Sequence, residues 1–239
     1  PVTLYLLPNT LGTRAVETLP SVIGELVHRL DGLIVESDRG GRAFLSLWKI
    51  PEVHKFPLAI LSKHARLPKA WDFYLEPIVK HGENWGLISD AGLPCIADPG
   101  ASLVRRARAL GIPVQAFSGP CSITLALMLS GLPSQSFTFL GYLPQSPKER
   151  VKSIKKAATS KEVSTSVCIE TSYRNVYTFE SLLDTLPSYA ELCVASDLSG
   201  PSELVLTRQV QSWRTTEDLG SVKQSITKVP TIFLFHIPN

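Results

Sequence analysis

The sequence is poor in cysteine, in long apolar runs and in excess charge, and each shortage excludes a class of protein. Its 239 residues include four cysteines that lie far apart, with no Cys-x-x-Cys spacing and no ligand-spaced histidines beside them. Neither a zinc site nor a disulfide framework is indicated, so we expect no metal and mostly buried free thiols. Without a recognisable signal peptide or a bilayer-length apolar run, the sequence predicts a cytoplasmic protein with no membrane partner.

Charge and composition leave several classes open. A formal net charge of +3 permits nucleic acid as a partner but does not argue for it, because no block of like charges concentrates the field. An apolar content of 44% with 19% charged residues is typical of a globular protein that buries a core. A chain of this length can form one large α/β domain or two of moderate size.

Apolar runs alternate with helical patterns in the first half of the chain. This alternation predicts a parallel sheet with helices on both faces. The expected strands are Val2–Leu7, Gly32–Glu36, Pro57–Leu61, Trp85–Ser89 and Pro113–Phe117, and the expected helices are Ala15–Leu30, Arg42–Leu47, Lys69–His81 and Ala101–Leu110.

The pattern changes at Ser118-Gly119-Pro120, where a helix, Ser122–Leu129, opens a second region. Several strands of this region are separated by short turns, which predicts a partly antiparallel sheet. The fold class is therefore α/β, with two domains, residues 1–117 and 118–239, and a ligand cleft expected between them. The expected strands of the second domain are Phe137–Tyr142, Thr165–Glu170, Glu191–Ser196, Leu204–Val210 and Thr231–His236.

The loop Ser89–Gly100 is the most informative segment of the chain. It follows a buried strand, and a loop at the carboxyl end of a parallel strand is where α/β proteins bind ligands. Two glycines and two prolines give it an unusual backbone. We expect Asp90 to contact a ligand, whereas Asp98 before Pro99 is interpreted as a capping or turn residue. A plain strand-to-helix connection is the alternative interpretation.

Several motifs, taken in order, resemble the tetrapyrrole methylase superfamily, and within it the branch of the small-subunit ribosomal RNA 2′-O-methyltransferase. The loop Ser89–Gly100 is similar to the Ser-Asp-Ala-Gly-x-Pro-x-x-x-Asp-Pro-Gly signature of that branch almost residue for residue. The resemblance implies two α/β domains that hold S-adenosyl-L-methionine, a homodimer, and ribosomal RNA or the small ribosomal subunit as partner. The other matching segments are Leu4–Gly12, Glu36–Arg39 with Arg42, Gly119–Ser122, Phe137–Pro144 and Glu170–Arg174.

The resemblance also implies which residues contact the cofactor. Asp90 and the backbone after it can accept from ribose hydroxyls or the methionine amine, and Ser122 opens a helix whose free amide groups favour a carboxylate. Pro8 offers a carbonyl, and packing at a strand end is its alternative role. The full expected set is Pro8, Asp90, Ala91, Gly92, Leu93, Ser122, Ile123, Pro230 and Thr231.

The chemistry expected is an in-line displacement at a sulfonium methyl, for which the protein mainly supplies alignment. A ribose hydroxyl acceptor would benefit from a nearby base, and arginines match phosphate oxygens. For each such residue a cap, an exposed ion pair or a solvated charge is the alternative role. The predicted catalytic residues are Glu36, Asp38, Arg39, Glu170 and Arg174, and Arg42, Lys63 and His64 are expected on the same rim.

Three further features have simpler interpretations. The basic stretch Lys148–Lys156 is interpreted as a solvated helix face, with an RNA-contacting face as the alternative. Met128 is expected in the core, from the periodicity of its helix. The tryptophans Trp48, Trp71 and Trp213 are expected to pack.

The chain departs from the branch at several positions, which bear on the acceptor. Asn9 lies in a loop that differs from the usual Thr-Pro-Ile-Gly-Asn, and Ser37-Asp38 stands where the branch has Asp-Thr. Tyr173 replaces the usual histidine, and Ala195–Gly200 lacks the typical Arg-Glu-Leu-Thr-Lys. Two alternatives follow: a methylase of tetrapyrroles (precorrin type) or other small molecules, and a catalytically inactive RNA-binding module that keeps the cofactor pocket.

Overall fold

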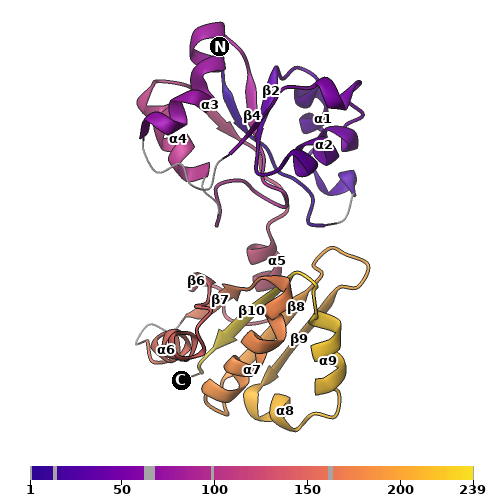
Figure 1. Cartoon of the computed structure of the whole chain (residues 1–239). Coiled ribbons are helices and arrows are strands. Elements are labelled where there is room, and N and C mark those ends of the chain that lie inside the picture. Colours follow the sequence, from indigo (N-terminus) through magenta and orange to yellow (C-terminus); the bar gives the residue numbers. More distant parts are fainter. Residues whose placement is uncertain (1, 13–14, 62–67, 98–99, 161–163, 239) are drawn as a thin grey trace. The chain divides into compact units, whose positions relative to one another are not determined.

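The structure is a computed structural model that describes residues 2–12, 15–61, 68–97, 100–160 and 164–238 (Figure 1). The chain divides into two compact units, Pro1–Cys121 and Ser122–Asn239. The domain boundary after Phe117 stays a prediction.

The first unit is built on a parallel sheet of five described strands in the order β3-β2-β4-β1-β5. All of them are short, and each lies within a run predicted to be a strand. The elements are β1 (Leu4–Leu6), η1 (Val16–Thr18), α1 (Val22–Val27), β2 (Gly32–Val35), α2 (Asp38–Leu47), η2 (Val53–Lys55), β3 (Leu58–Ile60), α3 (Pro68–His81), β4 (Trp85–Leu87), α4 (Gly100–Ala109) and β5 (Val114–Ala116).

Helices cover both faces of this sheet, with α3 and α4 on one side and α1 and α2 on the other (Figure 1). Apart from Gln115 in β5, the strands are apolar, because alternate side chains pack against helices on opposite faces. In β2, Ile34 packs with Trp71 and Leu75 of α3, whereas Leu33 packs with Phe44 of α2. The predicted parallel sheet is confirmed.

The predicted single helix Ala15–Leu30 is wrong. A 3-10 turn, η1, ends at Thr18, and α1 begins only at Val22. Pro20 lies between them, and Leu19 before it is extended. A residue that precedes proline is disfavoured in the helical region, so the chain cannot pass through this point as one helix.

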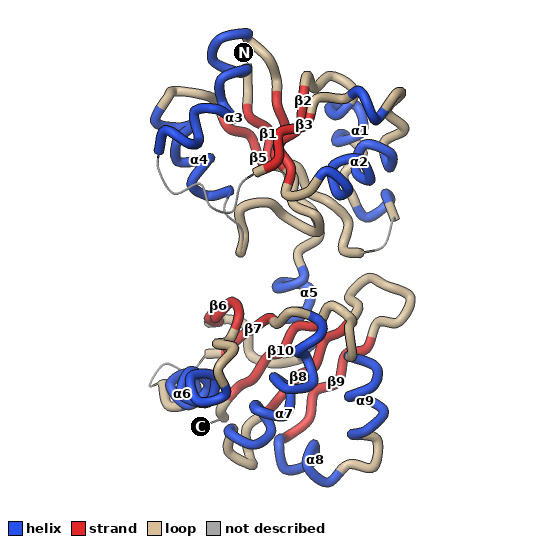
Figure 2. The backbone as a smooth tube through the Cα atoms, in the orientation of Figure 1, coloured by secondary structure: helices blue, strands red, loops and turns tan. Residues whose placement is uncertain are grey.

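The second unit contains a mixed sheet in the order β6-β7-β10-β8-β9 (Figure 2). Strands β6 and β7 are parallel, whereas β10 is antiparallel to both β7 and β8, and β9 is antiparallel to β8. The predicted partly antiparallel sheet is confirmed. The elements are α5 (Ser122–Ser130), β6 (Phe137–Tyr142), α6 (Pro147–Ala158), β7 (Thr165–Ile169), η3 (Ser172–Arg174), α7 (Asn175–Thr185), β8 (Glu191–Ser196), β9 (Leu204–Gln209), α8 (Val210–Thr215), α9 (Leu219–Ile226) and β10 (Thr231–His236).

The second sheet is also covered on both faces. Helix α5 packs on one face through Ala126 and Leu127, and α6 to α9 pack on the other around Phe179 and Trp213. The prediction that Met128 lies in the core is wrong, because its side chain is 77% exposed. Helix α5 is apolar on all sides, so periodicity alone does not select the buried face.

The cysteines are buried less often than expected, since Cys95 and Cys121 are partly exposed, whereas the tryptophans pack as expected. In the described structure all four cysteines are outside disulfides, with Cys168 and Cys193 buried. Burial raises the pKa of the Cys168 thiol to about 12 and that of Cys193 to about 11. Trp71 and Trp213 are buried, and the ring of Trp48 packs against Gly24.

Candidate active site

The central strands of the first sheet end at one edge, where three predicted site segments begin. Strands β1, β2 and β4 are parallel neighbours, so their carboxyl ends meet there. Pro8 follows β1, Glu36 follows β2 and Asp90 follows β4. The fold therefore brings together residues that lie more than fifty positions apart in the chain.

Asp90 is tied to the segment that follows β2. The hydroxyl of Ser37 donates to the Asp90 carboxylate, 3.0 Å from each oxygen, and the amide nitrogen of Asp90 donates to Glu36 Oε2 at 2.7 Å. Ser37 is also the N-cap of α2, where its Oγ accepts from the amide of Gly40 at 3.0 Å. One hydroxyl thus fixes the start of α2 and the position of the Asp90 side chain.

Gly40 leaves the space that the Asp90 carboxylate occupies. A Cβ atom at position 40 would lie 1.9 Å from Asp90 Oδ1, which no real pair of atoms tolerates. The carboxylate therefore rests against the first turn of α2, where unpaired amide groups and the positive end of the helix dipole favour a negative charge. It remains exposed to solvent on its other side.

Asn9 fastens the loop after β4 to the loop after β1. Its backbone nitrogen donates to the carbonyl of Gly92 at 2.8 Å. Its side-chain Nδ2 donates to the carbonyls of Ser89 at 3.0 Å and Asp90 at 3.3 Å. Gly92 has a φ of +69°, a conformation that favours glycine. The sequence marks Asn9 only as a departure from the family loop. No local signal marks its role, because the partners of its side chain lie 80 and 81 positions away in the chain.

Pro8 and Leu93 both lie beside Gly119. A Cβ atom at Gly119 would lie 2.2 Å from Pro8 Cβ and 3.6 Å from Leu93 Cδ2, so the ring of Pro8 packs closely on this backbone. Pro8 is buried, whereas Leu93 is partly exposed and Ala91 is exposed. Pro8 therefore packs at the end of its strand, which is the alternative role considered for it. Its contact with the cofactor stays a prediction.

The two arginines of α2 differ in whether other residues of the protein bind their guanidinium groups. Arg42 donates to the carbonyls of Val53 at 2.5 Å and Phe56 at 2.8 Å, and it pairs with Asp38 at 3.3 Å. Arg42 therefore holds the segment before β3. Arg39 is exposed and has no hydrogen-bond or ion-pair partner among the described residues, so its guanidinium is available to a ligand.

Glu170, the residue after β7 in the second unit, is a buried and fully engaged carboxylate. Its Oε1 accepts from the Thr171 amide at 2.7 Å and from Arg174 Nη2 at 2.9 Å, and its Oε2 accepts from Thr178 Oγ1 at 2.8 Å. Burial acts to raise the pKa of Glu170, but these hydrogen bonds outweigh it and hold the pKa below the ordinary 4.5. Such a carboxylate is a poor proton acceptor and a good anchor.

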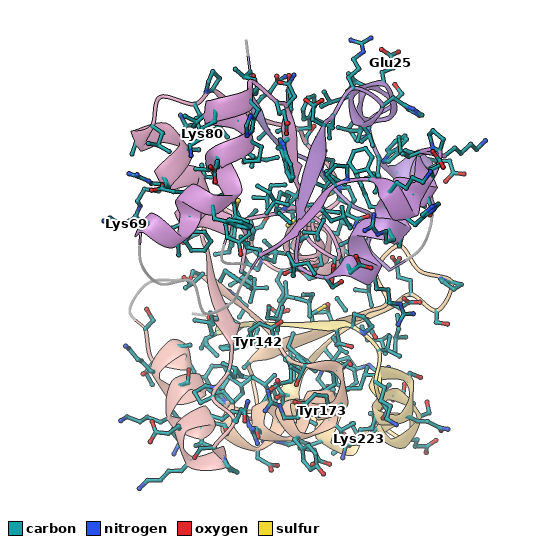
Figure 3. All side chains as sticks on the ribbon, turned by 45° about the horizontal axis from the view of Figure 1, so that its top comes forward. Glu25, Lys69, Lys80, Tyr142, Tyr173 and Lys223 are labelled. Carbon is teal, nitrogen blue, oxygen red and sulfur yellow. The ribbon has the colours of Figure 1, made fainter. Side chains whose placement is uncertain are left out.

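Arg174 is the group that Glu170 anchors. Its Nε and Nη2 both donate to Glu170 Oε1, at 3.1 and 2.9 Å, and the side chain is largely buried. Its Nη1 has no partner within the described residues. The ring of Tyr173, which is labelled in Figure 3, lies 5.4 Å from the guanidinium carbon of Arg174.

Thr231 belongs to a second polar network at the same edge of the second sheet. Its hydroxyl lies 2.9 Å from Ser196 Oγ and accepts from Asn175 Nδ2 at 3.2 Å. Asn175 Nδ2 also donates to the carbonyls of Ile226 at 2.9 Å and Val229 at 2.6 Å, which fixes the amide orientation. Asn175 Oδ1 is buried and has no partner in the described part of the chain. Sequence reasoning missed this residue because nothing in its local pattern distinguishes it.

The remaining predicted cofactor residues are more exposed. Ser122 and Ile123 form the first turn of α5 and are partly exposed. Pro230 is exposed, and its carbonyl accepts from the Asp197 amide at 2.9 Å. Lys63 and His64, and also Asp98 and Pro99, lie outside the described residues.

The basic segment Lys148–Lys156 coincides with α6 and divides into two faces. Arg150 is buried, and its Nε donates to Ser181 Oγ of α7 at 2.9 Å. The lysines of this helix are exposed on the opposite face, as expected for a solvated helix: Lys148, Lys152, Lys155 and Lys156.

Neither a metal-binding cluster nor a membrane-spanning helix occurs among the residues that the structure describes. No group of three or more histidine, cysteine, aspartate or glutamate side chains among them could hold a metal ion. None of the described helices combines the length and the apolar character that crossing a membrane requires.

The polar loops at the carboxyl edge of the first unit's parallel sheet are the arrangement with which α/β proteins bind ligands. The chain belongs to the family of tetrapyrrole (corrin/porphyrin) methylases, whose conserved pattern matches residues 49–212. Membership confirms the predicted family, the fold class and the predicted type of enzyme, an S-adenosylmethionine-dependent methyltransferase.

Individual proteins show the same relationship. Ribosomal RNA small subunit methyltransferase I of Vibrio cholerae is 31% identical over 208 residues, which is 84% of this chain and 67% of that protein. The enzyme of the same name from Haemophilus influenzae is 31% identical over 217 residues, 88% of this chain and 71% of that protein. The structure of uroporphyrin-III C-methyltransferase from Thermus thermophilus complexed with S-adenyl homocysteine has a TM-score of 0.57 at 15% identity and covers 98% of this chain and 97% of its own, which shows a shared fold.

Proposed function

We propose that the protein transfers the methyl group of S-adenosyl-L-methionine to a ribose 2′-hydroxyl of small-subunit ribosomal RNA. The similarity to ribosomal RNA small subunit methyltransferase I over most of this chain supports the RNA substrate. The observation that carries the proposal is the joined cluster of Glu36, Ser37 and Asp90, with the unpaired Arg39 in the first turn of α2. The homodimer and the cytoplasmic location implied by the resemblance belong to the same proposal.

The described residues fit S-adenosylmethionine at three points. The exposed carboxylate of Asp90, held by Ser37, can accept from ribose hydroxyls or from the ammonium group. The first turn of α5, at Ser122 and Ile123, offers amide groups to a carboxylate. Asn175 Oδ1, beside Thr231, is a buried acceptor that still lacks a donor. When bound, the cofactor supplies a methyl group on a sulfonium leaving group.

Glu36 is the residue that we propose as the acceptor of the hydroxyl proton. Its Oε2 is held by the amide of Asp90 at 2.7 Å, so the carboxylate has a fixed position at the strand edge. Glu170 suits this role less well, because its two oxygens are filled and its pKa is lowered. Asp38 is exposed and paired with Arg42. A base must be positioned before its pKa matters, and Glu36 meets that condition.

Arg39 and Arg174 are proposed to hold phosphates of the RNA. Arg39 is exposed without a protein partner, and Arg174 keeps Nη1 unpaired while Glu170 fixes the rest of its guanidinium. A guanidinium whose orientation is already fixed loses little freedom when it binds phosphate. Glu170 therefore acts as a positioning residue for Arg174.

The test uses the purified protein, S-adenosylmethionine with a labelled methyl group, and small ribosomal subunits from cells that lack the modification. We expect label in the RNA, and after complete digestion we expect it in a 2′-O-methylated nucleoside. Label in a methylated base would contradict the ribose assignment. Label in an added tetrapyrrole but none in RNA would support the small-molecule alternative, and cofactor binding without any transfer would support the inactive module.

A Glu36→Gln variant tests the proposed base. It keeps an oxygen for the Asp90 amide but cannot take a proton, so we expect methyl transfer to slow by about 100-fold or more while cofactor affinity is kept. Glu203→Gln, a change at a carboxylate that accepts from Ser199 in the second unit, is the control. Equal rates for Glu36→Gln and the unaltered protein would show that Glu36 is no base.

A further inference from the structure

Three tyrosines of the second unit are exposed although they are large and partly apolar. The exposed fractions are 57% for Tyr142, 65% for Tyr173 and 63% for Tyr177. No hydrogen-bond partner of their hydroxyl groups is found among the described residues. Single exposed aromatic residues are common on protein surfaces and need no explanation, so their placement decides whether they matter.

The three tyrosines are gathered at one edge of the second sheet. Tyr142 is the last residue of β6 and pairs in register with Ile169, the last residue of the parallel strand β7. The chain then reaches Tyr173 in η3 within four residues, and Tyr177 lies in the first turn of α7. Figure 3 labels Tyr142 and Tyr173 among the side chains of this unit. Glu170 and Thr231 lie at this same edge.

A positive charge accompanies these rings. The guanidinium carbon of Arg174 lies 5.4 Å from the centre of the Tyr173 ring, within the range of a cation–π contact. Glu170 holds Nε and Nη2 of Arg174, and Nη1 has no partner among the described residues. The edge therefore presents flat aromatic faces beside a donor that suits a phosphate oxygen.

Flat aromatic faces beside an arginine match the chemistry of unpaired nucleotides. Proteins bind single-stranded RNA by stacking bases on aromatic side chains and by tracking the phosphates with basic groups. A base inside a duplex has both faces covered, so it cannot use such a surface. We propose that Tyr142, Tyr173 and Tyr177, with Arg174, form a stacking surface for unpaired bases of the RNA substrate. This inference rests on the proposed function, and it assigns these tyrosines to binding and not to methyl transfer.

The experiment measures affinity for a fluorescein-labelled oligomer of twelve uridines by anisotropy, at fixed low salt, with the full chain. Tyr173→Ala and Tyr177→Ala are each expected to raise the dissociation constant about tenfold, which is the range for loss of one stacking ring. Tyr173→Phe keeps the ring and should restore affinity to within about twofold. The matched control is Tyr189→Ala: this tyrosine is 54% exposed and precedes β8, at the opposite edge of the same sheet.

The outcomes separate this inference from the proposed function. Loss of oligomer affinity in Tyr173→Ala and Tyr177→Ala, with Tyr189→Ala and Tyr173→Phe unaffected and all variants folded by circular dichroism, supports the stacking surface. Unchanged affinity in both alanine variants, or an equal loss in Tyr189→Ala, overturns it. The unaltered protein is assayed in parallel for methylation of small subunits, so that failure of the proposed function appears there and not in the oligomer affinity. A labelled duplex that binds as tightly as the single strand would also overturn the inference.

Discussion

At the scale of single residues, Asp90 shows how a loop carboxylate is given a defined position. Ser37 donates to it, Gly40 makes room for it, and the first turn of α2 places amide groups beside it. None of these three features needs to touch a ligand to control where the carboxylate points. Cofactor affinity should therefore respond to changes behind Asp90 as well as to changes in Asp90.

Gly40→Ala tests this dependence without removing a polar group. The new methyl group would lie 1.9 Å from Asp90 Oδ1, so the carboxylate must move. Alanine favours a helix over glycine by about 1 kcal/mol, so α2 should fold. We expect the dissociation constant for S-adenosylmethionine, measured by calorimetric titration, to rise about tenfold.

The control for Gly40→Ala is Gly220→Ala. Gly220 is also helical, in α9, and a Cβ atom there meets nothing within 4 Å. Its cofactor affinity should equal that of the unaltered protein. Unchanged affinity in Gly40→Ala would show that the position of Asp90 does not matter for binding. A large loss in Gly220→Ala would point to a general effect of helix substitution.

Glu170 gives a prediction about stability and pH. Its lowered pKa means that its ionised form stabilises the fold above about pH 4.5, the ordinary pKa, and that this contribution is lost as pH falls through the lower pKa of the folded state. Glu170→Gln removes the charge that Arg174 faces and should lower the free energy of unfolding by about 2 kcal/mol at pH 7. The difference between the two proteins should shrink as the pH is lowered below 4.5. Urea unfolding at several pH values measures it.

Glu180→Gln is the matched control for Glu170→Gln. Glu180 pairs with Lys223 at 2.8 Å, but both side chains are partly exposed. Surface ion pairs contribute little, so this variant should differ from the unaltered protein by less than about 0.5 kcal/mol. Similar losses in both variants would mean that burial of Glu170 has no special effect.

At the scale of helices and strands, the sequence predicts the sheets better than the helices. Each described strand lies within or matches a predicted run, because a short, mainly apolar segment stands out from the polar turns around it. The predicted helix Ala15–Leu30 is wrong because Pro20 outweighs its periodicity. The prediction that Met128 lies in the core is wrong because α5 is apolar on every side, so periodicity does not select its buried face.

The candidate site was predictable in part for a similar reason. Glu36 and Asp90 are found from the sequence because each is a polar residue after an apolar strand. Asn9 and Asn175 are missed because their roles depend on distant backbone atoms: Asn9 on the carbonyls of Ser89 and Asp90, and Asn175 on those of Ile226 and Val229. Such partners are set by the order of strands in the sheet, which local patterns do not encode.

Helix α6 gives a prediction at this scale, because its basic residues serve two purposes. Arg150 is buried and donates to Ser181 Oγ of α7 and to the carbonyl of Gln145 at 3.1 Å. Arg150→Ala leaves these partners unsatisfied and should lower the free energy of unfolding by about 2 to 3 kcal/mol. Lys152→Ala, on the exposed face of the same helix, should change it by less than about 0.5 kcal/mol. Equal changes in the free energy of unfolding for the two variants, measured with urea, would mean that the hydrogen bonds of Arg150 do not stabilise the fold.

At the scale of the whole molecule, the two units differ in how they are held together. The core of the first unit lies on both sides of a parallel sheet, around Leu75 and Phe44, and that of the second surrounds Phe179 and Leu127. Each of these clusters is formed by residues of a single unit. Each unit buries its own apolar surface, which is what an independently folding domain requires.

The predicted cofactor residues, in contrast, are divided between the units. Asp90 and its neighbours belong to the first, and Ser122 and Thr231 belong to the second. A fragment of residues 122–239 should therefore unfold cooperatively on heating, since its sheet and helices keep all the partners described here. It should nevertheless bind S-adenosylmethionine at least 100-fold more weakly than the whole chain, because it lacks the Asp90 loop. Thermal unfolding followed by circular dichroism, together with calorimetric titration, checks both expectations. A fragment that fails to fold would contradict the prediction of independent domains, and a folded fragment with full affinity would contradict the assignment of Asp90 to the cofactor.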